Sequence, residues 1–150
     1  MRVSVIGGST IDDQTYDVAY EVGQTLASRG HTVVCGGLTG AMEAVSKGAS
    51  EAGGQTIGVL PTDDPSNAND YIDIPVATGL GNARNVIVVL NGDAAIAVDG
   101  AYGTLSEIAF ALDSDMPVAG LDTHNVSGVT PVESPSEAVN TIEHEVNNST

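Results

Sequence analysis

Residues 36–61, GGLTGAMEAVSKGASEAGGQTIGVLP, follow a short apolar segment and together with it predict a strand–helix–strand unit. The preceding segment, HTVVC at residues 31–35, predicts a buried strand, and the glycines after it allow a tight turn. Residues 41–52 predict a helix, and residues 55–60 predict the next strand, which Pro61 ends. Two strands joined through a helix form a parallel pair with a right-handed crossover. This stretch therefore predicts a doubly wound α/β fold.

The same alternation continues in both directions along the chain. Further strands are predicted at residues 2–7, 71–76, 93–98 and 117–121, the last of which we expect to be the final strand. Further helices are predicted at residues 13–29, after Gly81 and at residues 104–112, and a closing helix is predicted to start at residues 134–137. Helical spacing predicts that Ala83, Val86, Ile87 and Leu90 share one helix face, and that Leu105, Ile108, Ala109 and Leu112 point inward. We therefore expect one Rossmann-like domain over residues 1–150, with a mostly parallel sheet and helices on both faces.

The charge of the chain excludes several classes of partner. Twenty acidic residues against four basic ones give a net charge of −16, which repels nucleic acid and anionic membranes. With a single lysine, the composition is similar to that of halophilic proteins, from salt-loving organisms. One cysteine and three dispersed histidines predict neither a disulfide framework nor a metal site. Since no signal peptide or membrane-length apolar run occurs, we expect a cytoplasmic protein.

Three glycine-rich turns follow predicted strands, at residues 7–9, 36–40 and 100–104. The carboxyl ends of parallel strands meet at one edge of the sheet, where ligands of such folds bind. Glycine lets a ligand approach the backbone closely, and a helix N-terminus attracts anions. These turns predict a phosphate site with contributions from Gly8, Ser9, Gly36, Gly37, Thr39, Gly40, Gly100, Tyr102, Gly103 and Thr104. The structural alternative is that tight turns need glycine anyway and that Thr104 and Glu107 form a capping box for their own helix.

Arg84 is the cation whose position is hardest to explain structurally. It lies in the first turn of an apolar helix, where the helix dipole opposes a positive charge by roughly 0.3–1 kcal/mol. The other three Lys and Arg residues occupy ordinary surface positions. We therefore expect Arg84 to bind an anion or to act in catalysis, with a structural salt bridge as the alternative. Cys35, beside the glycines, is expected to be a small buried hydrophobic residue rather than a nucleophile.

The segments GGLTGAMEAVSKGASEAGGQTIGVLP, TGLGNARNVIVV and GAYGTLSEIAFAL together resemble the Lonely-Guy-like superfamily of Rossmann-type proteins. Within it, the sequence is most similar to the small proteins related to molybdenum cofactor carriers. The resemblance runs from VIGGS at Val5 to about Leu121. It implies a homo-oligomer, either a dimer or a tetramer.

Active Lonely Guy enzymes release the base from nucleoside 5′-monophosphates and carry the signature Pro-Gly-Gly-x-Gly-Thr-x-x-Glu. The resemblance implies that Gly100, Gly103 and Thr104 bind phosphate and that Arg84 and Glu107 would be the catalytic pair. Here Asp99 replaces the proline and Ala101 the second glycine. These departures favour binding over hydrolysis.

Two functions therefore lead. The first is a carrier or sensor for a phosphorylated, nucleotide-like ligand, such as the molybdenum cofactor or a nucleotide. The second is a nucleoside 5′-monophosphate phosphoribohydrolase. A nicotinamide-dependent oxidoreductase is disfavoured, because the first turn, GGS, is not the GxGxxG fingerprint.

The net charge of −16 predicts that stability depends on salt. Acidic side chains repel one another in the folded chain, and added salt screens that repulsion. The thermal midpoint should rise by several degrees between low and molar sodium chloride, as measured by differential scanning calorimetry. A midpoint that does not change with salt would contradict this interpretation of the acidity.

Overall fold

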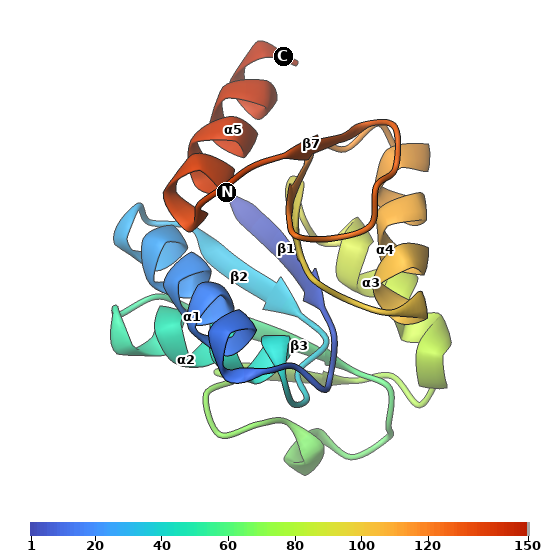
Figure 1. Ribbon diagram of the computed structural model, residues 1–150. Helices are drawn as coiled ribbons and strands as arrows, with labels where there is room; N and C mark the ends of the chain where they lie inside the picture. Colours follow the sequence, from blue (N-terminus) through green and yellow to red (C-terminus); the bar gives the residue numbers. More distant parts are fainter. Residues whose placement is uncertain (150) are drawn as a thin grey trace.

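Seven strands form one sheet in the order β4-β3-β2-β1-β5-β6-β7 in the computed structural model, which describes residues 1–149 (Figure 1). Each neighbouring pair is parallel. The strands are β1 (Arg2–Gly7), β2 (Thr32–Cys35), β3 (Thr56–Leu60), β4 (Ile74–Ala77), β5 (Ala94–Val98), β6 (Val118–Leu121) and β7 (Val129–Pro131). The predicted doubly wound α/β fold is confirmed.

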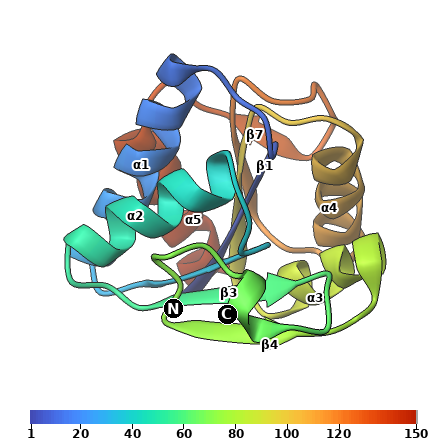
Figure 2. The same ribbon diagram turned by 90° about the horizontal axis from the view of Figure 1, so that it is seen from below.

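Helices cover both faces of this sheet. They are α1 (Asp13–Ser28), α2 (Ala41–Glu51), α3 (Asn85–Leu90), α4 (Tyr102–Asp113) and α5 (Pro135–Asn148), with short 3-10 segments η1 (Pro65–Asn67) and η2 (Gly81–Arg84). Figures 1 and 2 show α1, α2 and α5 on one face and α3 and α4 on the other. None of the helices in residues 1–149 is long and apolar enough to cross a bilayer.

The strand order reverses at β1, which pairs with β2 on one side and with β5 on the other. From β1 the chain proceeds outward to β4, then returns to β5 on the opposite side of β1. The helices that connect strands on one side of β1 therefore lie on one face of the sheet, and those on the other side lie on the opposite face. The connections that follow β1 and β5 lead to these opposite faces and so move apart. A crevice opens beyond the carboxyl ends of these two strands, which is the usual ligand position in this fold.

Helices α1 and α2 pack through glycines at close range. A Cβ on Gly23 would lie 2.0 Å from the carbonyl oxygen of Val45, and one on Gly48 would lie 2.0 Å from that of Tyr20. No side chain larger than hydrogen fits at either position. This contact fixes the positions of α1 and α2 relative to each other. The turns that follow β1 and β2 lead into these two helices, so their positions are fixed as well.

The sequence-based expectation that the strand at residues 117–121 is the last one was wrong. Three residues, Val129–Pro131, form β7, which pairs in parallel with β6 at the sheet edge. A strand of three residues that includes a proline has too little alternation to be recognised. The closing helix was predicted correctly: Ser134 Oγ accepts a hydrogen bond from the Glu137 amide at 3.1 Å.

The apolar faces predicted for two helices differ in part from the buried faces that the structure shows. In η2 and α3 the structure buries Arg84, Asn85, Val88 and Val89, whereas Leu90 is 63% exposed. In α4 it buries Thr104, Glu107, Ile108 and Ala111, whereas Ala109 is exposed. Both helices are turned so that polar side chains face the interior. Apolar residues are consequently left on their outer surface.

Candidate functional site

A cavity of about 220 Å³ lies beyond the carboxyl ends of β1, β2 and β3, next to the first turn of α4. We call it the small cavity. It brings together seven of the predicted site residues: Gly8, Ser9, Gly36, Arg84, Gly103, Thr104 and Glu107. Residues that the sequence analysis did not single out also line it, namely Val5, Ile6, Gly7, Leu38, Met42, Pro61, Asn82, Asn85 and Ala101.

The guanidinium of Arg84 lies at the inner wall of the small cavity. Its Nε donates to the carbonyl of Val59 at 2.9 Å, and Nη2 donates to the carbonyl of Gly36 at 3.4 Å. Nη1 donates to the side-chain oxygen of Asn85. These contacts tie the start of α3 to the carboxyl ends of β2 and β3. A Cβ on Gly36 would lie 2.5 Å from Met42 Sδ and 2.7 Å from Arg84 Nη2, so a larger residue here would displace these two side chains.

Glu107 enters the same cavity from α4 and is 7% exposed. Its carboxyl group forms no hydrogen bond or ion pair with any residue between 1 and 149. Burial raises the pKa of Glu107 to about 8, although the positive charge of Arg84 opposes this effect. At neutral pH the side chain is therefore a protonated acid that can donate a hydrogen bond.

The small cavity thus holds a cation without a balancing anion. Arg84 is 7% exposed, and its partners are carbonyl, amide and thioether groups, with no carboxylate in ion-pair range among residues 1–149. Burial lowers the pKa of Arg84, but an arginine stays protonated in proteins. A buried charge without a counter-ion is unfavourable. The arrangement therefore favours the entry of an anion into this cavity.

The N-terminus of α4 adds hydrogen-bond donors to the same place. The helix begins after Ala101, which provides no side-chain cap, and Ala101, Gly103 and Thr104 line the cavity. The first amides of a helix have no intrahelical acceptor and carry a partial positive charge. By contrast, α1 and α5 are capped by the side chains of Asp12 and Ser134.

Two of the lining glycines are not required by the fold. Neither Gly8 nor Gly103 has a positive φ. An added Cβ would lie no closer than 3.5 Å to its neighbours at Gly8 and 3.6 Å at Gly103, which are ordinary contacts. In a helix, alanine is favoured over glycine by roughly 1 kcal/mol, so the folded chain by itself favours alanine at position 103. Their bare backbone leaves room for a ligand.

The other predicted phosphate-binding residues do not line the small cavity, and their role stays a prediction. Gly37 and Gly40 adopt positive φ, and the amide of Ala41 at the start of α2 donates to the carbonyl of Gly8 at 2.9 Å. Thr39 Oγ1 donates to the carbonyl of Ser9 at 3.0 Å. The remaining two lie near α4: Gly100 packs against Thr104, and Tyr102 is 88% exposed.

The proposed capping box of Thr104 and Glu107 was wrong. The helix begins two residues earlier than predicted, at Tyr102, so both side chains belong to its inner face and point into the small cavity. Asn85 was missed, although a polar residue among the apolar residues of α3 was a usable signal. Cys35 is fully buried beside Ser46, and burial raises the pKa of its thiol, which fits the expected structural role.

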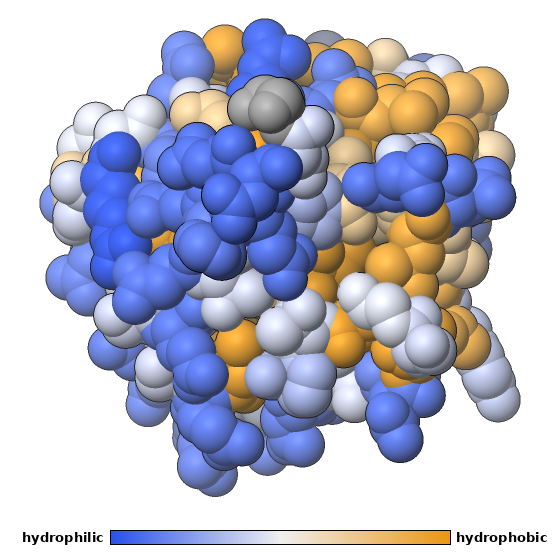
Figure 3. All heavy atoms as spheres, turned by 90° about the horizontal axis from the view of Figure 1, so that it is seen from above, coloured by the Kyte–Doolittle hydropathy of each residue, from blue (hydrophilic) through white to orange (hydrophobic). Residues whose placement is uncertain are grey.

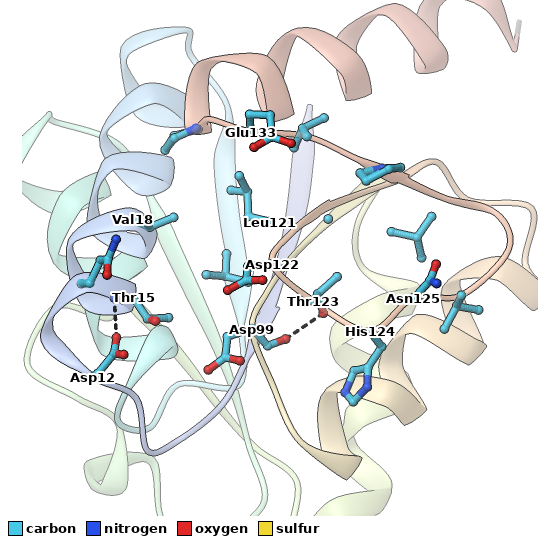
Figure 4. Close-up of a pocket in the computed structure, with 18 residues that line it drawn as sticks. Asp12, Thr15, Val18, Asp99, Leu121, Asp122, Thr123, His124, Asn125 and Glu133 are labelled. Carbon is cyan, nitrogen blue, oxygen red and sulfur yellow. Dashed lines mark hydrogen bonds between the residues drawn. The ribbon is translucent and has the colours of Figure 1, made fainter.

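A larger cavity, of about 540 Å³, lies beyond the carboxyl ends of β5 and β6 (Figure 4). We call it the large cavity. Four carboxylates line it, from Asp12, Asp99, Asp122 and Glu133, above an apolar floor that includes Val98 and Leu121. This cavity has no signal in the sequence, because β7 and the connection before it carry no recognisable pattern.

Comparison with known proteins identifies the relatives of this chain. The model of the SLOG cluster4 family matches residues 1–148. An uncharacterized protein of Archaeoglobus fulgidus is 47% identical over 141 residues, which are 93% of each chain. The molybdenum cofactor binding protein of Rippkaea orientalis superimposes with a TM-score of 0.91 at 36% identity, covering 97% of this chain and 96% of that one. The molybdenum cofactor carrier protein of Chlamydomonas reinhardtii gives 0.86 at 32% identity, covering 95% and 96%.

Hydrolases are more distant relatives. A cytokinin riboside 5′-monophosphate phosphoribohydrolase of Arabidopsis thaliana is 32% identical over 113 residues, which are 71% of this chain and 49% of that protein. The chain thus spans about half the length of this hydrolase.

The raised pKa of Glu107 predicts a pH-dependent effect of Glu107→Gln on stability. Because the folded chain holds this proton to about pH 8 and the unfolded chain loses it near 4.5, the wild type loses stability as pH rises between these values. The variant should equal the wild type below pH 4 and exceed it by on the order of a few kcal/mol at pH 8. Chemical unfolding in molar salt at several pH values measures this difference.

Glu21→Gln is the matched control, since Glu21 is exposed on α1. Its effect on the free energy of unfolding should not change with pH in the same range. A pH-independent effect of Glu107→Gln would show that Glu107 is ionised in the folded chain.

Proposed function

We propose that this chain, which belongs to the SLOG cluster4 family, is a carrier or sensor that binds a phosphorylated, nucleotide-like small molecule. One observation carries the proposal: the buried guanidinium of Arg84 has no carboxylate partner in residues 1–149 and faces a cavity. In a chain with a net charge of −16, such a site is the place where an anion is attracted rather than repelled.

A phosphate group fits the donors of the small cavity. Arg84 supplies the charge, the first amides of α4 supply directional donors, and Glu107 supplies a proton at neutral pH. Hydrogen bonds from charged or dipole-aligned donors to phosphate are stronger than those between neutral groups. The bare backbone at Gly8 and Gly103 allows the phosphate to approach these donors closely.

The molybdenum cofactor, a phosphorylated pterin, is a ligand of this class. The two solved relatives described above are named for binding or carrying it, and each aligns with almost the whole of this chain. We propose it as one candidate ligand, together with nucleoside monophosphates.

Hydrolysis of nucleoside 5′-monophosphates is the second candidate, supported by the phosphoribohydrolase relatives. That reaction passes through a cationic ribosyl centre, which an ionised carboxylate would stabilise. A pKa of about 8 leaves Glu107 uncharged at pH 7, and a bound phosphate would raise it further. This protonation state favours binding without turnover.

The two candidates predict different results for Thr104→Val and Glu107→Gln. A carrier should lose affinity for ribose 5-phosphate about tenfold or more in Thr104→Val, because a donor near the phosphate is removed while the shape is kept. Glu107→Gln should bind almost as well as the wild type at pH 7, since both side chains are neutral donors there. Isothermal titration in molar salt gives the affinities, and base release from AMP gives the turnover.

Ser114→Ala, at the far end of α4, serves as the control and should leave binding unchanged. Base release from AMP that falls about a hundredfold in Glu107→Gln with binding retained would establish the hydrolase instead. A wild type that binds no phosphorylated probe would contradict both candidates.

We also propose that the chain forms a homo-oligomer through α3 and α4. Leu90, Tyr102 and Phe110 are 63%, 88% and 41% exposed on these helices. Figure 3 shows apolar residues gathered on the side where Figure 1 places α4. Of the charged residues in η2, α3 and α4, Arg84 and Glu107 are buried, which leaves Asp113. Two copies with a charge of −16 each can approach on this face with little repulsion.

Light scattering in molar salt tests the oligomer. The wild type should have at least twice the 15.1 kDa mass of one chain. Leu90→Glu combined with Phe110→Glu should give a monomer, because charges then face each other across the interface, whereas Gln24→Glu on α1 should change nothing. A monomeric wild type would refute this arrangement.

A further inference from the structure

One asparagine in the connection between β3 and β4 (green in Figure 1) reaches back to the turn between β2 and α2. The backbone N–H of Asn69 donates to the carbonyl of Gly37 at 2.9 Å, and its side-chain Nδ2 donates to the carbonyl of Leu38 at 2.8 Å. Its Oδ1 accepts a hydrogen bond from the amide of Tyr71 at 3.0 Å. Asn69 thus holds two consecutive peptide groups of the turn, while its own side chain is fixed at both ends.

These hydrogen bonds set the direction of two backbone amides. In a trans peptide the C=O and the following N–H point in opposite directions, and none of the peptide bonds in residues 1–149 is cis. Because the carbonyls of Gly37 and Leu38 point to Asn69, the N–H groups of Leu38 and Thr39 point away from it. Leu38 lines the small cavity, whereas Asn69 does not. The turn therefore lies between Asn69 and the cavity, and the two amides are directed to the cavity side.

The N–H groups of Leu38 and Thr39 have no acceptor within residues 1–149. Other groups of the same turn are paired: the amide of Ala41 donates to the carbonyl of Gly8 at 2.9 Å, and Thr39 Oγ1 donates to that of Ser9 at 3.0 Å. Consecutive backbone N–H groups that converge on one side of a turn form a site for an anion. The two unpaired amides are therefore donors that a ligand in the cavity can use.

The small cavity itself supplies independent evidence for a ligand. Arg84 and Glu107 line it, each 7% exposed, and the Glu107 carboxyl has no hydrogen-bond partner in the part of the chain that the structure describes. In the sheet, β1 lies between β2 and β5, so the turn after β2 and the start of α4 approach this cavity from two sides. A phosphate group has acceptor oxygens in several directions and can use donors from both sides at once.

We propose that Asn69 is a positioning residue for anion binding, which presents the amides of Leu38 and Thr39 to the phosphate in the small cavity without touching the ligand itself. This inference rests on the proposed function, which assigns a phosphate to that cavity. Asparagine suits the role because its side chain donates at one end and accepts at the other, which an ionised aspartate cannot do. The structural alternative is that Asn69 only satisfies two carbonyls and stabilises the connection between β3 and β4.

Asn69→Asp tests this role, because it keeps the hydrogen bond accepted from Tyr71 and removes the donor to Leu38. Its affinity for ribose 5-phosphate, measured by isothermal titration in molar salt, should fall about tenfold or more. Asn69→Ala removes the same donor without adding a charge and should weaken binding by a similar factor.

Asn67→Asp is the matched control. It adds the same charge to the same connection and keeps the hydrogen bond that Asn67 Oδ1 accepts from Thr62 Oγ1 at 2.8 Å. Since Asn67 does not contact the turn between β2 and α2 and molar salt screens the added charge, this variant should bind ribose 5-phosphate within about twofold of the wild type.

Amide proton–nitrogen correlation spectra separate positioning from stabilisation of the connection. In the wild type, ribose 5-phosphate should shift the amide resonances of Leu38 and Thr39 together with those of Gly103 and Thr104. In both Asn69 variants at saturating ligand, the shifts of Gly103 and Thr104 should persist, whereas those of Leu38 and Thr39 should be largely lost. The wild-type measurement does not depend on whether either variant folds.

Two results would overturn this inference and leave the proposed function standing. In the first, the resonances of Gly103 and Thr104 shift in the wild type and those of Leu38 and Thr39 do not. In the second, both Asn69 variants retain the wild-type shifts of Leu38 and Thr39 at saturation. If the wild type binds no ribose 5-phosphate and none of these resonances shifts, the proposed function fails and the inference fails with it.

Discussion

The burial of Arg84 is the interaction on which the architecture of the site depends. Its guanidinium bonds to the carbonyls of Val59 and Gly36, so one side chain joins the ends of β2 and β3 to the start of α3. Burying a cation requires that its donors be satisfied, and the backbone carbonyls do so without cancelling its charge. Glu107 is the acidic residue that could form an ion pair with Arg84. Its carboxyl group stays neutral because it is buried as well. The result is a positive cavity in a strongly acidic chain.

This constraint also explains how the surrounding helices are oriented. To bring Arg84 and Asn85 inward from one helix and Thr104 and Glu107 from another, α3 and α4 present polar side chains to the sheet. Their remaining apolar residues then face outward, where they are available to a second copy. Site formation and the proposed self-association are thus two consequences of one helix orientation.

The sequence was sufficient to predict the parallel sheet and its crossovers, and seven of the predicted site residues line one cavity at the strand ends. Glycine turns and helical spacing are local signals, and the superfamily resemblance pointed to Arg84 and Glu107. Three features could not be predicted, because they arise from contacts distant in sequence: β7, the inward faces of α3 and α4, and the large cavity. Hydrophobic spacing predicted that Ala109 faces the interior, because such spacing treats Glu107 as a charged residue that faces solvent. In the structure Glu107 is buried in its neutral form, and Ala109 is exposed.

Co-crystallisation with ribose 5-phosphate in molar salt distinguishes an anion site at Arg84 from a structural role of this side chain. Phosphate oxygens should lie within hydrogen-bonding distance of Arg84 and of the amides of Gly103 and Thr104. Glu107 should donate a hydrogen bond to the ligand rather than pair with Arg84. A structure in which Glu107 and Arg84 form an ion pair and the phosphate lies elsewhere would show that Arg84 has a structural role only.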